Sequence, residues 1–174
     1  MTAEPTTCTE LTTANTQHKL YSKLGVLIMD ALTRKPAVWN EWKESKRLRA
    51  LAVCEDSETC ARVVEFLRDL SGDLGRECQI IKRVWLVNEF FVPELKEIAA
   101  NEAAHDDLII LSTHSDGNLP EQVQSWVDLW LLRKGGRPAV LGALLDPNPE
   151  QDSALMQVRL QEIAKRGNLE FFAQ

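Results

Sequence analysis

The pattern of apolar and polar residues changes near residue 47 and divides the chain into three parts. Residues 1–17 are rich in threonine and poor in large apolar side chains, a composition typical of a flexible tail. In residues 18–46 apolar side chains recur at helical spacing, which predicts an N-terminal helical extension. The apolar run 25–29 leaves an extra strand open as an alternative. Residues 47–174 alternate short apolar runs with amphipathic stretches, as expected for one α/β domain.

Five short apolar runs in this last part are predicted strands, because each is bounded by polar residues or by turn-forming glycine and proline. They occupy residues 48–54, 79–87, 108–112, 138–145 and 169–172. The connections carry apolar residues at helical spacing, with Val64 on the expected apolar face of the first helix and Ile98 on that of the second. Such units form parallel sheets with right-handed crossovers. We therefore predict a flavodoxin-like three-layer sandwich with a five-stranded parallel sheet in the order 2-1-3-4-5.

Composition narrows the classes of partner. The net charge of −6 argues against nucleic acid, because phosphate binding needs a basic surface. We find no apolar run long enough to span a bilayer and no secretory signal at the start of the chain. We therefore expect a cytoplasmic protein with neither nucleic-acid nor membrane partners. The four cysteines form no CxxC pair, so we expect no disulfide framework, and we expect Cys54 and Cys60 to be buried free thiols.

Acidic and hydroxyl residues follow three of the predicted strands. Glu55 and Asp56 follow the first strand, Ser112 ends the third, and Asp146 comes after the fourth. Ligands of open parallel sheets bind beyond the carboxyl ends of the strands, and carboxylate oxygens suit a divalent cation such as Mg²⁺. Glu55 and Asp56 are therefore candidate metal ligands. The same loop is also a predicted helix cap, because an aspartate side chain accepts hydrogen bonds from free helix N–H groups.

The element order over 48–172 resembles a response-regulator receiver domain, with Glu55 and Asp56 where receivers place an acidic pair that helps bind magnesium. The resemblance implies a phospho-acceptor aspartate at the end of the third strand, and that place holds Ser112. The fourth strand ends without a clear serine or threonine, and no lysine follows the fifth strand. Aspartyl phosphorylation needs a carboxylate nucleophile supported by metal and lysine. The resemblance therefore implies a degenerate pseudo-receiver, a non-catalytic signalling or regulatory module that acts through protein contacts.

Three other functions use the same region. A metal-assisted enzyme would use the carboxylates of Glu55, Asp56, Asp116 and Asp146. A nucleotide or flavin binder suits the predicted sheet, but the loop after the first strand is acidic and lacks glycine, which disfavours phosphate. Ser112, His114 and Asp116 are the residue types of a hydrolase. Their closeness in sequence and the lack of a nucleophile elbow argue against such a triad.

Two features suggest a protein partner. Trp126 and Trp130 lie one helical turn apart, and such a pair either packs in the core or, on an uncovered helix, makes an interaction surface. The N-terminal helical extension offers a second surface, on which we expect self-association as a homodimer. The sequence does not name the partner.

Overall fold

The computed structural model describes residues 46–75, 78–114, 117–146 and 151–174. The predicted tail, the helical extension before residue 46 and the homodimer contact assigned to it lie outside the described residues. Within the described residues, the structure contains no helix long and apolar enough to cross a membrane.

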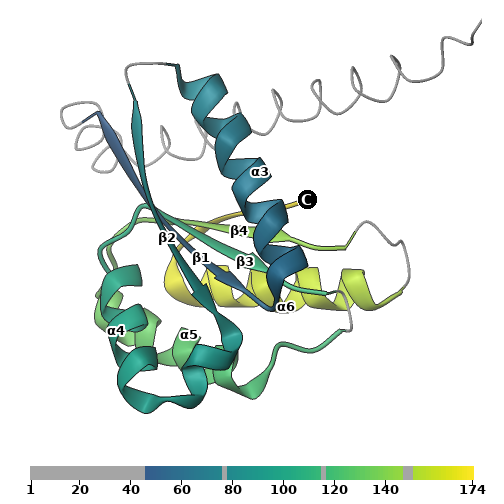
Figure 1. Ribbon diagram of the computed structural model, residues 1–174. Coiled ribbons are helices and arrows are strands. Elements are labelled where there is room, and N and C mark those ends of the chain that lie inside the picture. Colours follow the sequence, from purple (N-terminus) through teal and green to yellow (C-terminus); the bar gives the residue numbers. More distant parts are fainter. Residues whose placement is uncertain (1–45, 76–77, 115–116, 147–150) are drawn as a thin grey trace, which may run out of the picture.

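The described chain forms an α/β fold with one five-stranded sheet (Figure 1). Its strands are β1 (Arg47–Cys54), β2 (Gln79–Leu86), β3 (Leu108–Ser112), β4 (Val140–Leu144) and β5 (Glu170–Ala173). Its helices are α3 (Ser57–Leu74), the 3-10 helix η1 (Val87–Phe91), α4 (Pro93–Ala103), α5 (Glu121–Lys134) and α6 (Gln151–Gly167). All pairings are parallel and the strand order is β2-β1-β3-β4-β5. The structure therefore confirms the predicted flavodoxin-like sheet and its order.

The sheet separates two hydrophobic clusters. Alternate residues of β1, such as Ala50 and Cys54, pack toward α3, while Leu51 and Val53 pack toward α4, α5 and α6. All residues of β3 and β4 are buried, as expected for central parallel strands covered on both faces. Figure 1 shows α3 on one side of the sheet and the other helices below it. Cys54 is a buried free thiol in the α3 cluster, as predicted, whereas the free thiol Cys60 is only half-buried.

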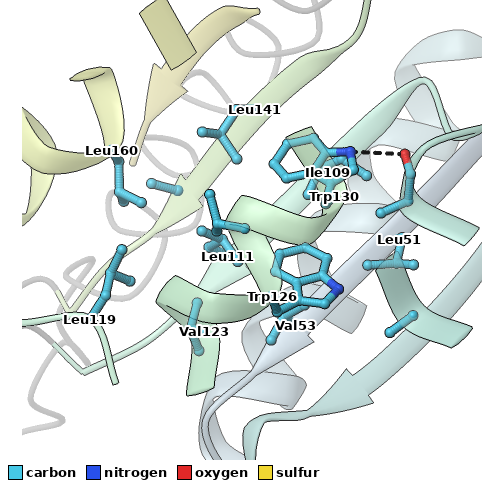
Figure 2. Close-up of a cluster of buried hydrophobic side chains, with 14 of the residues drawn as sticks. Leu51, Val53, Ile109, Leu111, Leu119, Val123, Trp126, Trp130, Leu141 and Leu160 are labelled. Carbon is cyan, nitrogen blue, oxygen red and sulfur yellow. Dashed lines mark hydrogen bonds between the residues drawn. The ribbon is translucent and has the colours of Figure 1, made fainter. Parts of the chain in front are cut away.

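Trp126 and Trp130 belong to the core, so their prediction as an interaction surface is wrong. Both rings are fully buried, because α5 packs against both the sheet and α4 in one hydrophobic cluster. Trp126 stacks between Phe90 and Trp130, with ring centroids 5.4 and 5.5 Å apart. Figure 2 shows both indoles among sheet and helix side chains and the bond from Trp130 Nε1 to the Ala103 carbonyl, which is 3.1 Å long. The core-packing alternative is the observed one.

Gly142 makes room for an aromatic contact between β5 and the α3 layer. A Cβ atom at Gly142 would lie 2.3 Å from Cζ of Phe172. The Phe172 ring also stacks on Phe66 of α3, with centroids 5.8 Å apart. Glycine in the middle of β4 therefore marks a close approach by a neighbouring side chain.

Ion pairs join neighbouring residues at the end of the sheet where β3 begins. The Asp107 carboxylate accepts a hydrogen bond of 2.9 Å from the Arg49 backbone N–H, and its other oxygen lies 3.4 Å from the Arg137 guanidinium. The neighbouring Asp106 is buried, and Nη1 of Arg83 lies 2.7 and 2.9 Å from its two oxygens. Burial raises the pKa of Asp106, while Arg83 opposes that rise. These acids are structural, and they lie at the end of the sheet opposite the candidate site.

Candidate functional site

The carboxyl ends of β1, β3 and β4 meet at one edge, where the sequence placed its candidate residues. The Glu55 N–H donates to the Ser112 carbonyl at 3.2 Å, and the Thr113 N–H donates to the Leu144 carbonyl at 3.3 Å. These backbone bonds join the three loops that follow the strands. They bring Glu55 and Ser112 together as expected from the strand order.

Ser112 is fully buried and faces the helix that covers the sheet. It is in register with Cys54 of β1, and its hydroxyl donates to the Thr59 carbonyl in the first turn of α3 at 3.0 Å. Thr59 is itself fully buried. The Ser112 side chain thus ties β3 to α3 and does not reach solvent at the carboxyl edge.

Asp56 is the N-cap of α3, which confirms the predicted helix cap. Its carboxylate accepts the Thr59 backbone N–H at 2.9 Å, while the Asp56 N–H donates to the Thr59 hydroxyl at 2.8 Å. This reciprocal pair is a capping box. The backbone bond from Thr59 and then the bond from His114 lower the pKa of Asp56 to about 2.

His114 connects the loops at the carboxyl edge. Its Nε2 lies 2.8 Å from an Asp56 oxygen, its Nδ1 lies 2.9 Å from an Asp146 oxygen, and its backbone N–H donates to Glu55 at 2.9 Å. Arg62 of α3 pairs with the other oxygen of Asp146. The bonds to Asp56 and then to Asp146 raise the pKa of His114 to about 9. At neutral pH the ring is an imidazolium that donates to two carboxylates.

This network leaves the candidate metal ligands engaged by the chain itself. Asp56 caps α3 and binds His114, and Glu55 accepts the His114 N–H. Within the described residues, no group of three or more histidine, cysteine or acidic side chains has the arrangement of a metal site. Asp116 lies outside the described residues. The assignment of Glu55 and Asp56 as magnesium ligands stays a prediction.

The hydrolase arrangement is not formed between its described members. Ser112 donates to Thr59, and both ring nitrogens of His114 are bonded to carboxylates. A general base must accept a proton from its nucleophile, and this imidazolium has no nitrogen left for Ser112.

His114 is the residue whose importance the sequence did not reveal. The sequence predicts that His114 lies in a loop after the third strand, close in sequence to Ser112 and Asp116. Its partners Asp56 and Asp146 come from two other loops. The available signal was the strand order, which brings all three loops to one edge.

A separate groove of about 530 Å³ lies between α5 and α6. Its apolar lining includes Val127 and Ile163, and its charged lining includes Arg159. Arg166 at its rim pairs with Asp128. The groove has none of the residues predicted for chemistry.

Comparisons with known proteins found no matching family model, and no curated protein or solved structure with significant similarity to the chain. A functional proposal therefore rests on the fold and on the carboxyl edge.

Proposed function

We propose that this protein is a non-catalytic, receiver-like signalling or regulatory module that acts in the cytoplasm through protein–protein contacts. The observation that carries the proposal is the state of Ser112, the residue at the phospho-acceptor place of the receiver resemblance. Its hydroxyl is fully buried and is bonded to the Thr59 carbonyl. A phosphoryl donor needs an exposed carboxylate there, and this side chain provides neither the carboxylate nor the access.

The charges around Ser112 support the same proposal. Magnesium at a receiver site is attracted by uncompensated carboxylates, and here the imidazolium of His114 lies between Asp56 and Asp146. Arg62 adds a second positive group on Asp146. The chain therefore supplies the positive charge that a bound cation would otherwise provide.

Incubation of the full chain with acetyl phosphate and Mg²⁺ tests the proposal. We expect the intact mass to stay unchanged, while a phosphorylatable receiver domain in the same reaction gains a phosphoryl group. A hydroxylamine-sensitive adduct on this protein would overturn the non-catalytic proposal. Ser112→Ala is the matched variant for a hydroxylamine-resistant adduct, because a phosphoserine at Ser112 resists hydroxylamine and would be lost in this variant.

Calorimetric titration with Mg²⁺ tests the charge argument. We expect no binding heat for the wild-type chain at millimolar Mg²⁺. In His114→Ala the carboxylates of Asp56 and Asp146 lose their shared cation, so this variant should bind Mg²⁺ more tightly than the wild type. Binding by the wild type with His114 in place would favour the metal-assisted enzyme instead.

A further inference from the structure

Among the described residues, the outer edge of β2 carries open backbone groups. β2 is the outermost strand on one side of the described sheet (Figure 1). The Gln79 N–H donates to the Lys46 carbonyl at 2.9 Å, on the side of β1. In a parallel ladder, every second residue points its N–H and C=O toward the same neighbour. The residues between them point outward, and these are Ile80, Lys82, Val84 and Leu86.

Glu89 closes one end of this edge. The Leu86 N–H donates to the Glu89 carboxylate at 2.7 Å. This bond agrees with the expectation that the N–H groups of the even-numbered residues of β2 point away from β1. The outward N–H groups of Ile80, Lys82 and Val84 have no hydrogen-bond partner among the described residues. These three residues, called the open edge below, form a stretch long enough to pair with another strand.

Exposed apolar side chains flank the open edge on both faces of the sheet. On one face, Val84 is 44% exposed and Val64 of α3 is 51% exposed. Val64 lies on the side of α3 turned away from Phe66, whose ring stacks on β5. On the other face Ile98 is 48% exposed. It lies one turn before Glu102, which accepts a hydrogen bond from Trp85 of β2.

Both exposed sets therefore border one strand edge. Successive side chains of a β-strand point to opposite faces. A strand added at the open edge would cover Val84 and Val64 with one set of side chains and Ile98 with the other. This accounts for the exposure of Val64 and Ile98, which were expected to be buried.

The positive charge of Lys82 determines which residue is favoured opposite it in an added strand. It is exposed and forms no ion pair among the described residues, whereas its neighbour Arg83 pairs with Asp106 and Glu102. An exposed lysine on an edge strand disfavours pairing with an identical strand, because like charges then come close together. An acidic residue opposite Lys82 is favourable for the same reason.

We propose that the open edge binds an extended segment of a partner protein, in which an acidic residue faces Lys82 and apolar residues flank it. The inference rests on the proposed function and names the kind of partner contact. In this contact, main-chain hydrogen bonds provide the affinity, and the charge of Lys82 favours segments with an acidic residue.

Hydrogen exchange of the full chain with a blocked peptide tests this proposal. The probe is Thr-Val-Thr-Glu-Thr-Val-Thr, and the matched control carries lysine in place of glutamate. We expect the glutamate peptide to slow exchange at the amides of Ile80, Lys82 and Val84, while the inward amides of Ile81 and Arg83 change little. The lysine peptide should bind several-fold more weakly.

Two variants make the outcome specific. Val84→Pro removes an outward N–H without touching the β1 ladder, so we expect it to abolish the response while the urea midpoint changes little. Lys82→Glu should reverse the preference between the peptides. Leu132→Lys, at an exposed site on α5, is the control and should respond like the wild type.

Three results would overturn the proposal. They are no protection by the glutamate peptide at millimolar concentration, equal responses to both peptides, and slow exchange at the three amides before peptide is added. In the last case the edge is already occupied: concentration dependence would assign it to a second copy, and its absence to another part of the same chain. Each result leaves the acetyl phosphate test untouched, so failure of this contact is distinguishable from failure of the proposed function.

Discussion

At the scale of single residues, two neighbouring indoles with the same burial have different polar surroundings. Trp126 and Trp130 are both fully buried. Trp130 Nε1 donates to the Ala103 carbonyl, while Trp126 Nε1 has no hydrogen-bond partner in the described part of the chain. A buried donor without a partner costs about 1–3 kcal/mol. Apolar packing therefore stabilises both residues, and only Trp126 carries this polar cost.

This difference predicts unequal effects of removing each N–H. Trp130→Phe should lower the free energy of unfolding by about 2–3 kcal/mol, because it loses packing and a hydrogen bond. Trp126→Phe loses similar packing but removes an unpartnered donor, so its cost should be smaller by about 1 kcal/mol or more. Urea unfolding of the two variants measures the difference. Equal losses, or a larger loss for Trp126→Phe, would contradict the assignment.

Ser112 gives a second prediction at this scale. Ser112→Ala removes the bond to the Thr59 carbonyl and should cost about 1 kcal/mol. Ser112→Asp places a carboxylate in a fully buried position beside a carbonyl oxygen, and it should cost more than about 3 kcal/mol. Thermal and urea unfolding measure both values. Wild-type stability in Ser112→Asp would show that this place still accommodates an acidic acceptor.

At the scale of elements, periodicity predicted which segments are strands and helices but not which helix faces are covered. Val64 and Ile98 lie at helical spacing from buried residues, yet both are about half exposed. The spacing defines a face, whereas its coverage depends on whether the sheet continues beyond that helix. Both helices border β2, where the described sheet ends. Helical spacing therefore predicted side-chain burial correctly at the centre of the sheet and wrongly at its edge.

The contact between β4, β5 and α3 predicts a coupled pair of substitutions. Gly142→Ala should cost about 1–3 kcal/mol, because the new Cβ displaces the Phe172 ring from its stacking on Phe66. In a Phe172→Leu background the same change should cost clearly less, since the ring that causes the clash is gone. A double-mutant cycle by urea unfolding gives the coupling. Additive losses would show that the clash is relieved elsewhere.

At the scale of the whole molecule, the sequence was sufficient for the strand order but not for the network at its edge. Alternation of strands and helices with right-handed crossovers restricts the topology, and this brings Glu55, Asp56 and Ser112 to one end of the sheet. Which side chains then pair depends on loop directions that no periodicity encodes. The acidity of Glu55 and Asp56 predicts both a helix cap and a possible metal site, but it does not predict the bonds of these residues to His114 that the structure contains.

The bonds from the His114 ring to Asp56 and Asp146 predict how the stability of the fold depends on pH. The pKa of His114 is raised from 6.5 to about 9 in the folded chain, so its contribution is fully present below about pH 6.5 and is lost as the pH rises through 9. The pKa of Asp56 is lowered from 3.8 to about 2. Its contribution is therefore present above about pH 3.8 and is lost as the pH falls toward 2.

His114→Gln isolates the alkaline part of this dependence. Glutamine keeps polar contacts with Asp56 and Asp146 but carries no titrating charge. The urea midpoint of the wild type should exceed that of the variant most strongly near pH 6, and the difference should shrink between about pH 7 and pH 10. Other groups that titrate in this range act on both proteins and cancel in the difference. A difference independent of pH would mean that His114 joins the loops through its shape and not through its charge.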